Sequence, residues 1–125
     1  MKRVLKDLAF DDAELSILFT DDRHISQLNS QYLGRDGPTN VLAFPMTYGP
    51  PPDIESPMLG DVVVSVDTAI RESNEMKEPL TETLCRLLIH GILHLLHYDH
   101  EGSLEKTKRM EKEEARLFAL IKKDL

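Results

Sequence analysis

Apolar residues along the chain occur either in short runs and alternations or at helical spacing. The short runs and alternations predict three strands. Residues 14–20 (ELSILFT) form an almost continuous apolar run and predict a buried strand. Residues 40–44 (NVLAF) predict a second short strand, which Pro45 ends. In residues 60–66 (GDVVVSV), valines at alternate positions share one face, which predicts a third strand.

Apolar residues at intervals of three and four predict helices between and around these strands. Segments with this spacing are residues 1–10, residues 22–33, residues 67–77, a stretch from 79 through 95 and a stretch from 103 through 121. We expect Asp21 or Asp22 to cap the second helix, Asp67 the third and Ser103 the last. Pro79 suits the first turn of the fourth helix.

The order of these elements predicts a mixed α/β (α+β) fold. Residues 46–58 contain four prolines and predict an exposed loop without regular structure. We expect a single small sheet of about three to four strands packed with about four to six helices. The length suits one domain over residues 1–125.

The net charge of −7 argues against a protein that binds nucleic acid through a broad basic surface. Any nucleic-acid role must therefore depend on locally placed arginines or on a protein partner. Cys85 is the only cysteine, which is typical of a protein from a reducing compartment. The sequence has no signal-peptide pattern and no apolar stretch long enough for a bilayer. We expect a cytoplasmic protein without membrane association.

Four of the five histidines lie within residues 90–100 (HGILHLLHYDH), with the spacing HxxxHxxxxxH among three of them. His90 and His94 are one helical turn apart, so their imidazoles share a helix face. A straight helix would place His97 roughly 10 Å along its axis from His90, too far for a shared metal ion. The chain must leave the helix after His94, and His100 is far enough along to return. We therefore expect a cleft at this helix end where His90, His94 and His100 bind one divalent ion, by preference Zn²⁺.

This assignment leaves two roles for His97. Histidine is enriched among non-glycine residues in the left-handed conformation, so His97 can end the helix in such a turn. Its imidazole can instead serve as a spare ligand. Asp99 and Glu101 flank the third ligand and are candidates to accept hydrogen bonds from the ligand imidazoles. His24, near a helix start, is interpreted as a packed or solvated residue.

Three neutral imidazoles leave one coordination position open, which is typical of a catalytic zinc site. Such a zinc ion lowers the pKa of its bound water to about 7 and polarises a carbonyl or phosphoryl oxygen. Zinc peptidases with the HExxH motif place a glutamate directly after the first histidine, where this chain has Gly91. The sequence thus predicts hydrolytic chemistry without the usual peptidase base. Nickel, copper or iron would also suit three imidazoles.

Three motifs resemble the YbeY family of rRNA maturation endoribonucleases, and the likeness covers residues 15–121. The family's histidine signature, HGxLHLxGYDH, corresponds to residues 90–100. A second family signature resembles residues 32–45 (YLGRDGPTNVLAFP). The family's GDIVIS strand resembles residues 60–65 (GDVVVS).

The resemblance implies a mixed α/β fold with one small sheet and a zinc ion in a cleft, held by His90, His94 and His100. It further implies a single-strand-specific, metal-dependent endoribonuclease. Such an enzyme acts in late-stage maturation of the 16S rRNA 3′ end and in ribosome quality control. The implied partners are rRNA and the small ribosomal subunit or its proteins, which would deliver RNA to an acidic protein.

The chain departs from the family pattern at four places. Many members have an arginine, proposed to contact RNA phosphate, where this chain has Leu33. Arg35 is the nearest guanidinium that can replace it, because arginine suits bidentate phosphate contacts; a solvated loop cation is the alternative. Ala43 stands in place of a common serine and His97 in place of a common glycine. The N-terminal part is also shorter than usual for the family.

The sequence leaves two other functions open. The first is a different zinc hydrolase, such as a peptidase, which the HxxxH pair supports and Gly91 weakens. The second is a non-catalytic ribosome assembly factor, in which the metal ion would mainly hold the last helix in place.

Overall fold

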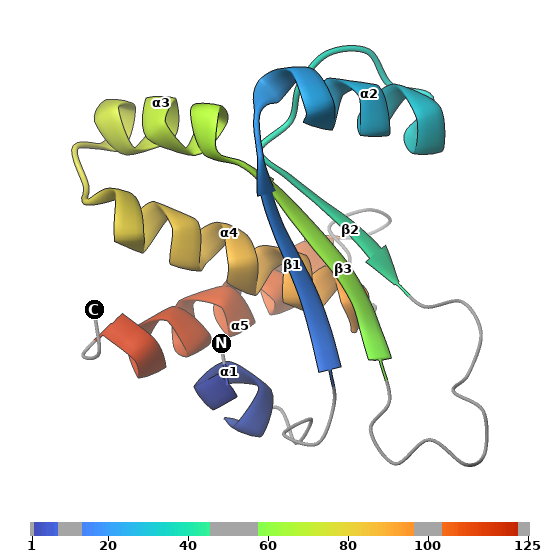
Figure 1. The fold of residues 1–125 in the computed structure, drawn as a ribbon. Helices are drawn as coiled ribbons and strands as arrows, with labels where there is room; N and C mark the ends of the chain where they lie inside the picture. Colours follow the sequence, from blue (N-terminus) through green and yellow to red (C-terminus); the bar gives the residue numbers. More distant parts are fainter. Residues whose placement is uncertain (1, 8–13, 46–57, 97–103, 123–125) are drawn as a thin grey trace.

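The computed structural model describes residues 2–7, 14–45, 58–96 and 104–122. Within these ranges the chain forms five helices and one sheet of three strands, shown in Figure 1. In chain order the elements are α1 (Lys2–Asp7), β1 (Glu14–Thr20), α2 (Asp22–Leu33), β2 (Val41–Pro45), β3 (Met58–Ser65), α3 (Val66–Met76), α4 (Leu80–Leu95) and α5 (Leu104–Lys122). This arrangement confirms the predicted mixed α/β class and the predicted small sheet.

The central strand of the sheet is β3. It pairs in parallel with β1 and antiparallel with β2, giving the order β1-β3-β2. Both faces of β3 are buried: Val62 and Val64 pack in the core that includes α4 and α5, and Val63 packs with Ile25 of α2 and Leu42 of β2. The predicted alternation of valines is therefore real, but both sets of side chains are covered.

The prediction that β1 is buried was wrong. Ile17, Leu18 and Phe19 are 37%, 44% and 49% exposed. The reason is the position of β1 at an edge of the described sheet, while α4 packs against β2 and β3. An apolar run indicates a strand, but the strand's neighbours determine how much of it is covered.

Asp21 caps α2 as predicted, and its carboxylate accepts a hydrogen bond from the backbone N–H of His24 at 2.8 Å. The predicted cap of α3 was wrong: Ser65 is the N-cap, and the helix begins at Val66. Asp67 instead accepts a hydrogen bond from the backbone N–H of Asp22 at 3.0 Å. Two residues of capping type, Ser65 and Asp67, lie two positions apart here, and the strand ends at the first of them.

Asp22 connects the starts of α2 and α3 at the end of β3. Its carboxylate accepts hydrogen bonds from the hydroxyls of Ser65 and Thr68, each at 2.6 Å, and pairs with Arg71 at 2.8 Å. The Ser65 and Thr68 hydrogen bonds, and then Arg71, lower the pKa of this carboxyl below its usual value. The aspartate thus stays ionised and holds the two helices together.

Two boundaries differ slightly from the predictions. Pro79 is the N-cap residue of α4, so it directly precedes the first turn in which we expected it. Met58 begins β3, and the rest of the predicted loop over residues 46–58 lies outside the described residues. The predicted cap Ser103 also lies outside them.

Gly91 allows α4 to lie directly on the sheet. A Cβ atom at this position would come within 2.6 Å of Val62 Cγ1 and 3.3 Å of Val41 Cγ2. Val62 is fully buried and branched at Cβ, so it cannot easily move away. The glycine therefore sets the distance between the histidine-bearing helix and strands β2 and β3.

We predict that Gly91→Ala lowers the free energy of unfolding by about 1–2 kcal/mol. Crowding in a packed core costs typically about 1–3 kcal/mol, which exceeds the gain of about 1 kcal/mol in helix propensity. Urea unfolding with a chelator present measures the change without any effect of bound metal. Thr81→Ala is the control, because Thr81 is exposed on the same helix. Unchanged or raised stability of Gly91→Ala would contradict the close packing described here.

Candidate functional site

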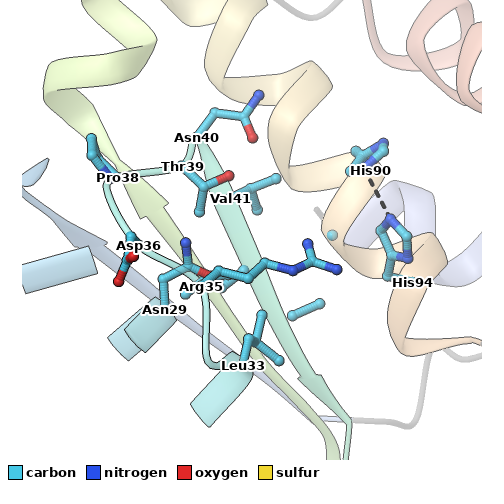
Figure 2. A pocket seen from close by; sticks show the side chains of 13 residues that line it. Asn29, Leu33, Arg35, Asp36, Pro38, Thr39, Asn40, Val41, His90 and His94 are labelled. Carbon is cyan, nitrogen blue, oxygen red and sulfur yellow. Dashed lines mark hydrogen bonds between the residues drawn. The ribbon is translucent and has the colours of Figure 1, made fainter. Parts of the chain in front are cut away.

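A pocket of about 540 Å³ lies between α4 and the segment that connects α2 to β2. Figure 2 shows its walls, which come from the end of α2, residues 35–40, strand β2 and the C-terminal part of α4. Helix α4 contributes His90, Gly91 and His94. The pocket thus combines two segments, within residues 33–43 and 90–94, that the sequence analysis had selected separately.

The two histidines of α4 point toward each other. Their Nε2 atoms are 3.0 Å apart, and the ring centroids are 4.5 Å apart at an interplanar angle of 72°. With zinc–nitrogen bonds of about 2.0–2.1 Å, two imidazole nitrogens on a tetrahedral ion are about 3.3 Å apart. Small rotations of the rings would give that spacing, so the pair fits a zinc ion bound through both Nε2 atoms.

A carboxylate from α5 holds one of these imidazoles. Glu114 Oε1 lies 2.6 Å from Nδ1 of His90. A carboxylate can only accept, so Nδ1 carries the proton and the lone pair of neutral His90 is on Nε2, facing His94. This is the arrangement by which carboxylates orient metal-binding histidines in many proteins.

Glu114 was missed from the sequence, where Asp99 and Glu101 were the candidates for this role. Those two residues lie outside the described residues. A signal for Glu114 was nevertheless present, because it falls in the apolar stripe of α5. The buried members of that stripe are Met110, Leu117 and Ile121.

Only part of the predicted ligand set lies in the described part of the chain. His90 and His94 are brought together there, whereas His97 and His100 lie outside the described residues. Within residues 2–7, 14–45, 58–96 and 104–122, no three His, Cys, Asp or Glu side chains form a group suited to a metal ion. The third ligand and both roles of His97 therefore stay predictions.

Arg35 lines the same pocket as the two histidines. Figure 2 shows its side chain extending across the pocket toward His94. Gly34 ends α2 with φ 64°, and the Arg35 N–H then donates to the carbonyl of Asn29 at 3.2 Å. The left-handed glycine thus turns the chain so that the Arg35 side chain lies in the same pocket as the histidine pair. Leu33 and Ala43, at two positions of departure from the family pattern, also line the pocket.

The packing of α4 on the sheet leaves little room for a side chain at the position after His90. A side chain at residue 91 would start toward Val62 and Val41, against the sheet. A glutamate there would collide with Val62 of β3 unless the helix moved away from the sheet. The geometry therefore supports the sequence argument against a mechanism of the HExxH type.

Other candidate residues have ordinary surroundings. His24 is exposed, and its Nδ1 lies 2.7 Å from the hydroxyl of Thr20, as expected for a residue outside a metal site. Burial raises the pKa of the Cys85 thiol, which keeps this residue protonated and unreactive. None of the described helices combines the length and apolar character needed to cross a membrane.

Comparisons with known proteins agree with the architecture and the motifs. The model of a family described as "Endoribonuclease YbeY" matches residues 1–122. Proteins named Endoribonuclease YbeY from Syntrophotalea carbinolica and Geobacter metallireducens are 48% and 44% identical to the chain over 124 residues. Each alignment covers 98% of this chain and 83% of the relative.

A solved structure is also similar. The solution structure of a Thermotoga maritima protein matches with a TM-score of 0.55 at 25% sequence identity. The match covers 98% of this chain and 86% of the other. Together with the family match and the identities above, this similarity shows that the chain belongs to the YbeY endoribonuclease family.

Proposed function

We propose that this protein is a metal-dependent endoribonuclease that cleaves single-stranded RNA. The observation that carries the proposal is the pocket in which paired imidazole nitrogens lie opposite an arginine side chain. Membership of the YbeY family supports RNA as the substrate, since the curated relatives are named endoribonucleases. The pocket supports hydrolysis at a phosphate, because two imidazole nitrogens that could share a cation lie in the same pocket as a guanidinium.

The proposed metal site consists of His90, His94 and His100. The Nε2 atoms of the first two are spaced for one ion, and the third is assigned from the HxxxHxxxxxH spacing. A bound Zn²⁺ supplies hydroxide at neutral pH and a Lewis acid for a phosphoryl oxygen. The chain's own contribution is to hold the imidazoles in one tautomer and orientation.

Arg35 is proposed to bind a phosphate of the RNA backbone. Its side chain crosses the pocket, and a guanidinium can donate two parallel hydrogen bonds to phosphate oxygens. These bonds would hold the scissile phosphodiester beside the histidine pair.

The proposed cellular role is late-stage maturation of the 16S rRNA 3′ end and ribosome quality control in the cytoplasm. Rapid capture of free RNA is not expected from a chain with net charge −7. The small ribosomal subunit or its proteins are therefore the proposed partners that present the RNA. Family membership supports this role.

One assay separates the candidate functions. Zinc-loaded protein is given a single-stranded RNA, a duplex of the same sequence and casein, beside a His94→Ala control. The proposal expects cleavage of the single strand only, lost in the control. Casein cleavage would favour a peptidase, and inactivity on all three with metal bound would favour the assembly factor.

The ligand assignment makes a direct prediction. Replacing His90, His94 or His100 by alanine should remove stoichiometric zinc, because two imidazoles bind the ion far more weakly than three. His24→Ala should keep a full equivalent, since His24 contacts Thr20 outside the pocket. Metal content after dialysis measures both. A full equivalent in His100→Ala would refute this ligand set and make His97 the next candidate.

The phosphate contact predicts a second set of results. Arg35→Ala should lower kcat/KM on single-stranded RNA roughly 10- to 100-fold, the value of a hydrogen bond to a charged group. The slope of log affinity against log salt should fall by about 0.7, the contribution of one phosphate contact on a single strand. Zinc content should be unchanged. Arg23→Ala is the matched control, because Arg23 is exposed on α2 and does not line the pocket. Wild-type kinetics for Arg35→Ala across the salt series would make Arg35 an ordinary loop residue.

A further inference from the structure

Glu114 lies in the stripe of α5 that is otherwise formed by buried apolar side chains. Met110 lies one turn before it and Leu117 one turn after it, and both are fully buried. The Glu114 side chain is only 28% exposed. A carboxylate in such a place destabilises the fold unless it is hydrogen-bonded, so its presence calls for a specific contact.

That contact is made to the candidate metal site. Glu114 Oε1 lies 2.6 Å from His90 Nδ1, at the side of the ring away from His94. The bond fixes the proton on Nδ1 and prevents the ring from flipping. The lone pair of Nε2 then stays directed at the point where His94 Nε2 also points, 3.0 Å away.

We infer that Glu114 is a positioning residue, through which the docking of α5 on α4 controls metal affinity. The inference rests on the proposed function, because it takes His90 and His94 as ligands. Helix α5 is itself held by its buried stripe and by Arg116, which pairs with Asp7 of α1 at 2.6 Å. A helix remote in sequence thus sets the orientation of a ligand in α4. Coupling is reciprocal, so a bound ion also stabilises the docked α5.

The experiment compares Glu114→Leu and Glu114→Gln with the wild-type protein. Competition with a chromophoric chelator measures Zn²⁺ affinity, and ¹⁵N NMR of the imidazoles in metal-free protein reports the His90 tautomer. We expect Glu114→Leu to weaken zinc binding roughly 10- to 100-fold, as is usual for loss of such a partner. Its metal-free thermal stability should be kept or raised, because leucine extends the apolar stripe. Glu111→Leu, at an exposed position of α5, should change neither affinity nor tautomer.

The outcomes decide between positioning and mere packing. Wild-type affinity and an unchanged His90 tautomer in Glu114→Leu would overturn the inference. If that variant did not fold, Glu114→Gln would decide, since the amide keeps the size but not the charge. It should show a smaller loss of affinity and a measurable tautomer change, and the absence of both would equally overturn the inference. A wild-type protein without zinc affinity would refute the proposed metal site, and the tautomer comparison would then still test whether Glu114 orients His90.

Discussion

The contact between Gly91 and Val62 determines where the site can form. It brings the axis of α4 close to β3, with residue 91 facing the sheet. Successive residues of a helix are rotated by about 100°, so His90 and His94 both fall on the same flank of that contact. Both histidines line the pocket there, together with Val41, Leu42 and Ala43 of β2. A bulkier residue at position 91 would move both histidines together.

The opposite wall of the pocket is held by two asparagines. Asn29, buried at the end of α2, donates from its side chain to the Gly37 carbonyl at 3.1 Å. Asn40 accepts at its backbone carbonyl from the Ser65 N–H, and its side chain donates to Glu72, each at 3.0 Å. The segment that carries Arg35 is thus tied to α2 at one end and to β3 and α3 at the other. A guanidinium on a segment held in this way loses less entropy on binding a phosphate than one on a free loop.

Local patterns in the sequence were sufficient to predict most helices and strands and the proximity of His90 to His94. His90 and His94 are one helical turn apart, so their proximity could be predicted from the sequence alone. The exposure of β1 depends on which strand lies in the middle of the sheet, which no local pattern contains. Glu114 is 24 residues from His90, and only the packing of α5 on α4 makes them neighbours. A carboxylate inside an apolar stripe is nevertheless a local signal of such a distant partner.

The acidic composition and the proposed RNA chemistry are compatible because they act over different distances. At physiological salt the Debye length is about 8 Å, so distant surface carboxylates contribute little to the potential at the histidine pair, in contrast to Asp36 in the pocket wall and Glu114 beside His90. Within the pocket, Arg35 and a bound divalent ion would be the nearest cationic groups to a phosphate. Short-range attraction at the site can therefore coexist with long-range repulsion of free RNA. If the proposed function holds, such a balance would favour substrates that a partner already holds near the pocket and disfavour indiscriminate cleavage of other single strands.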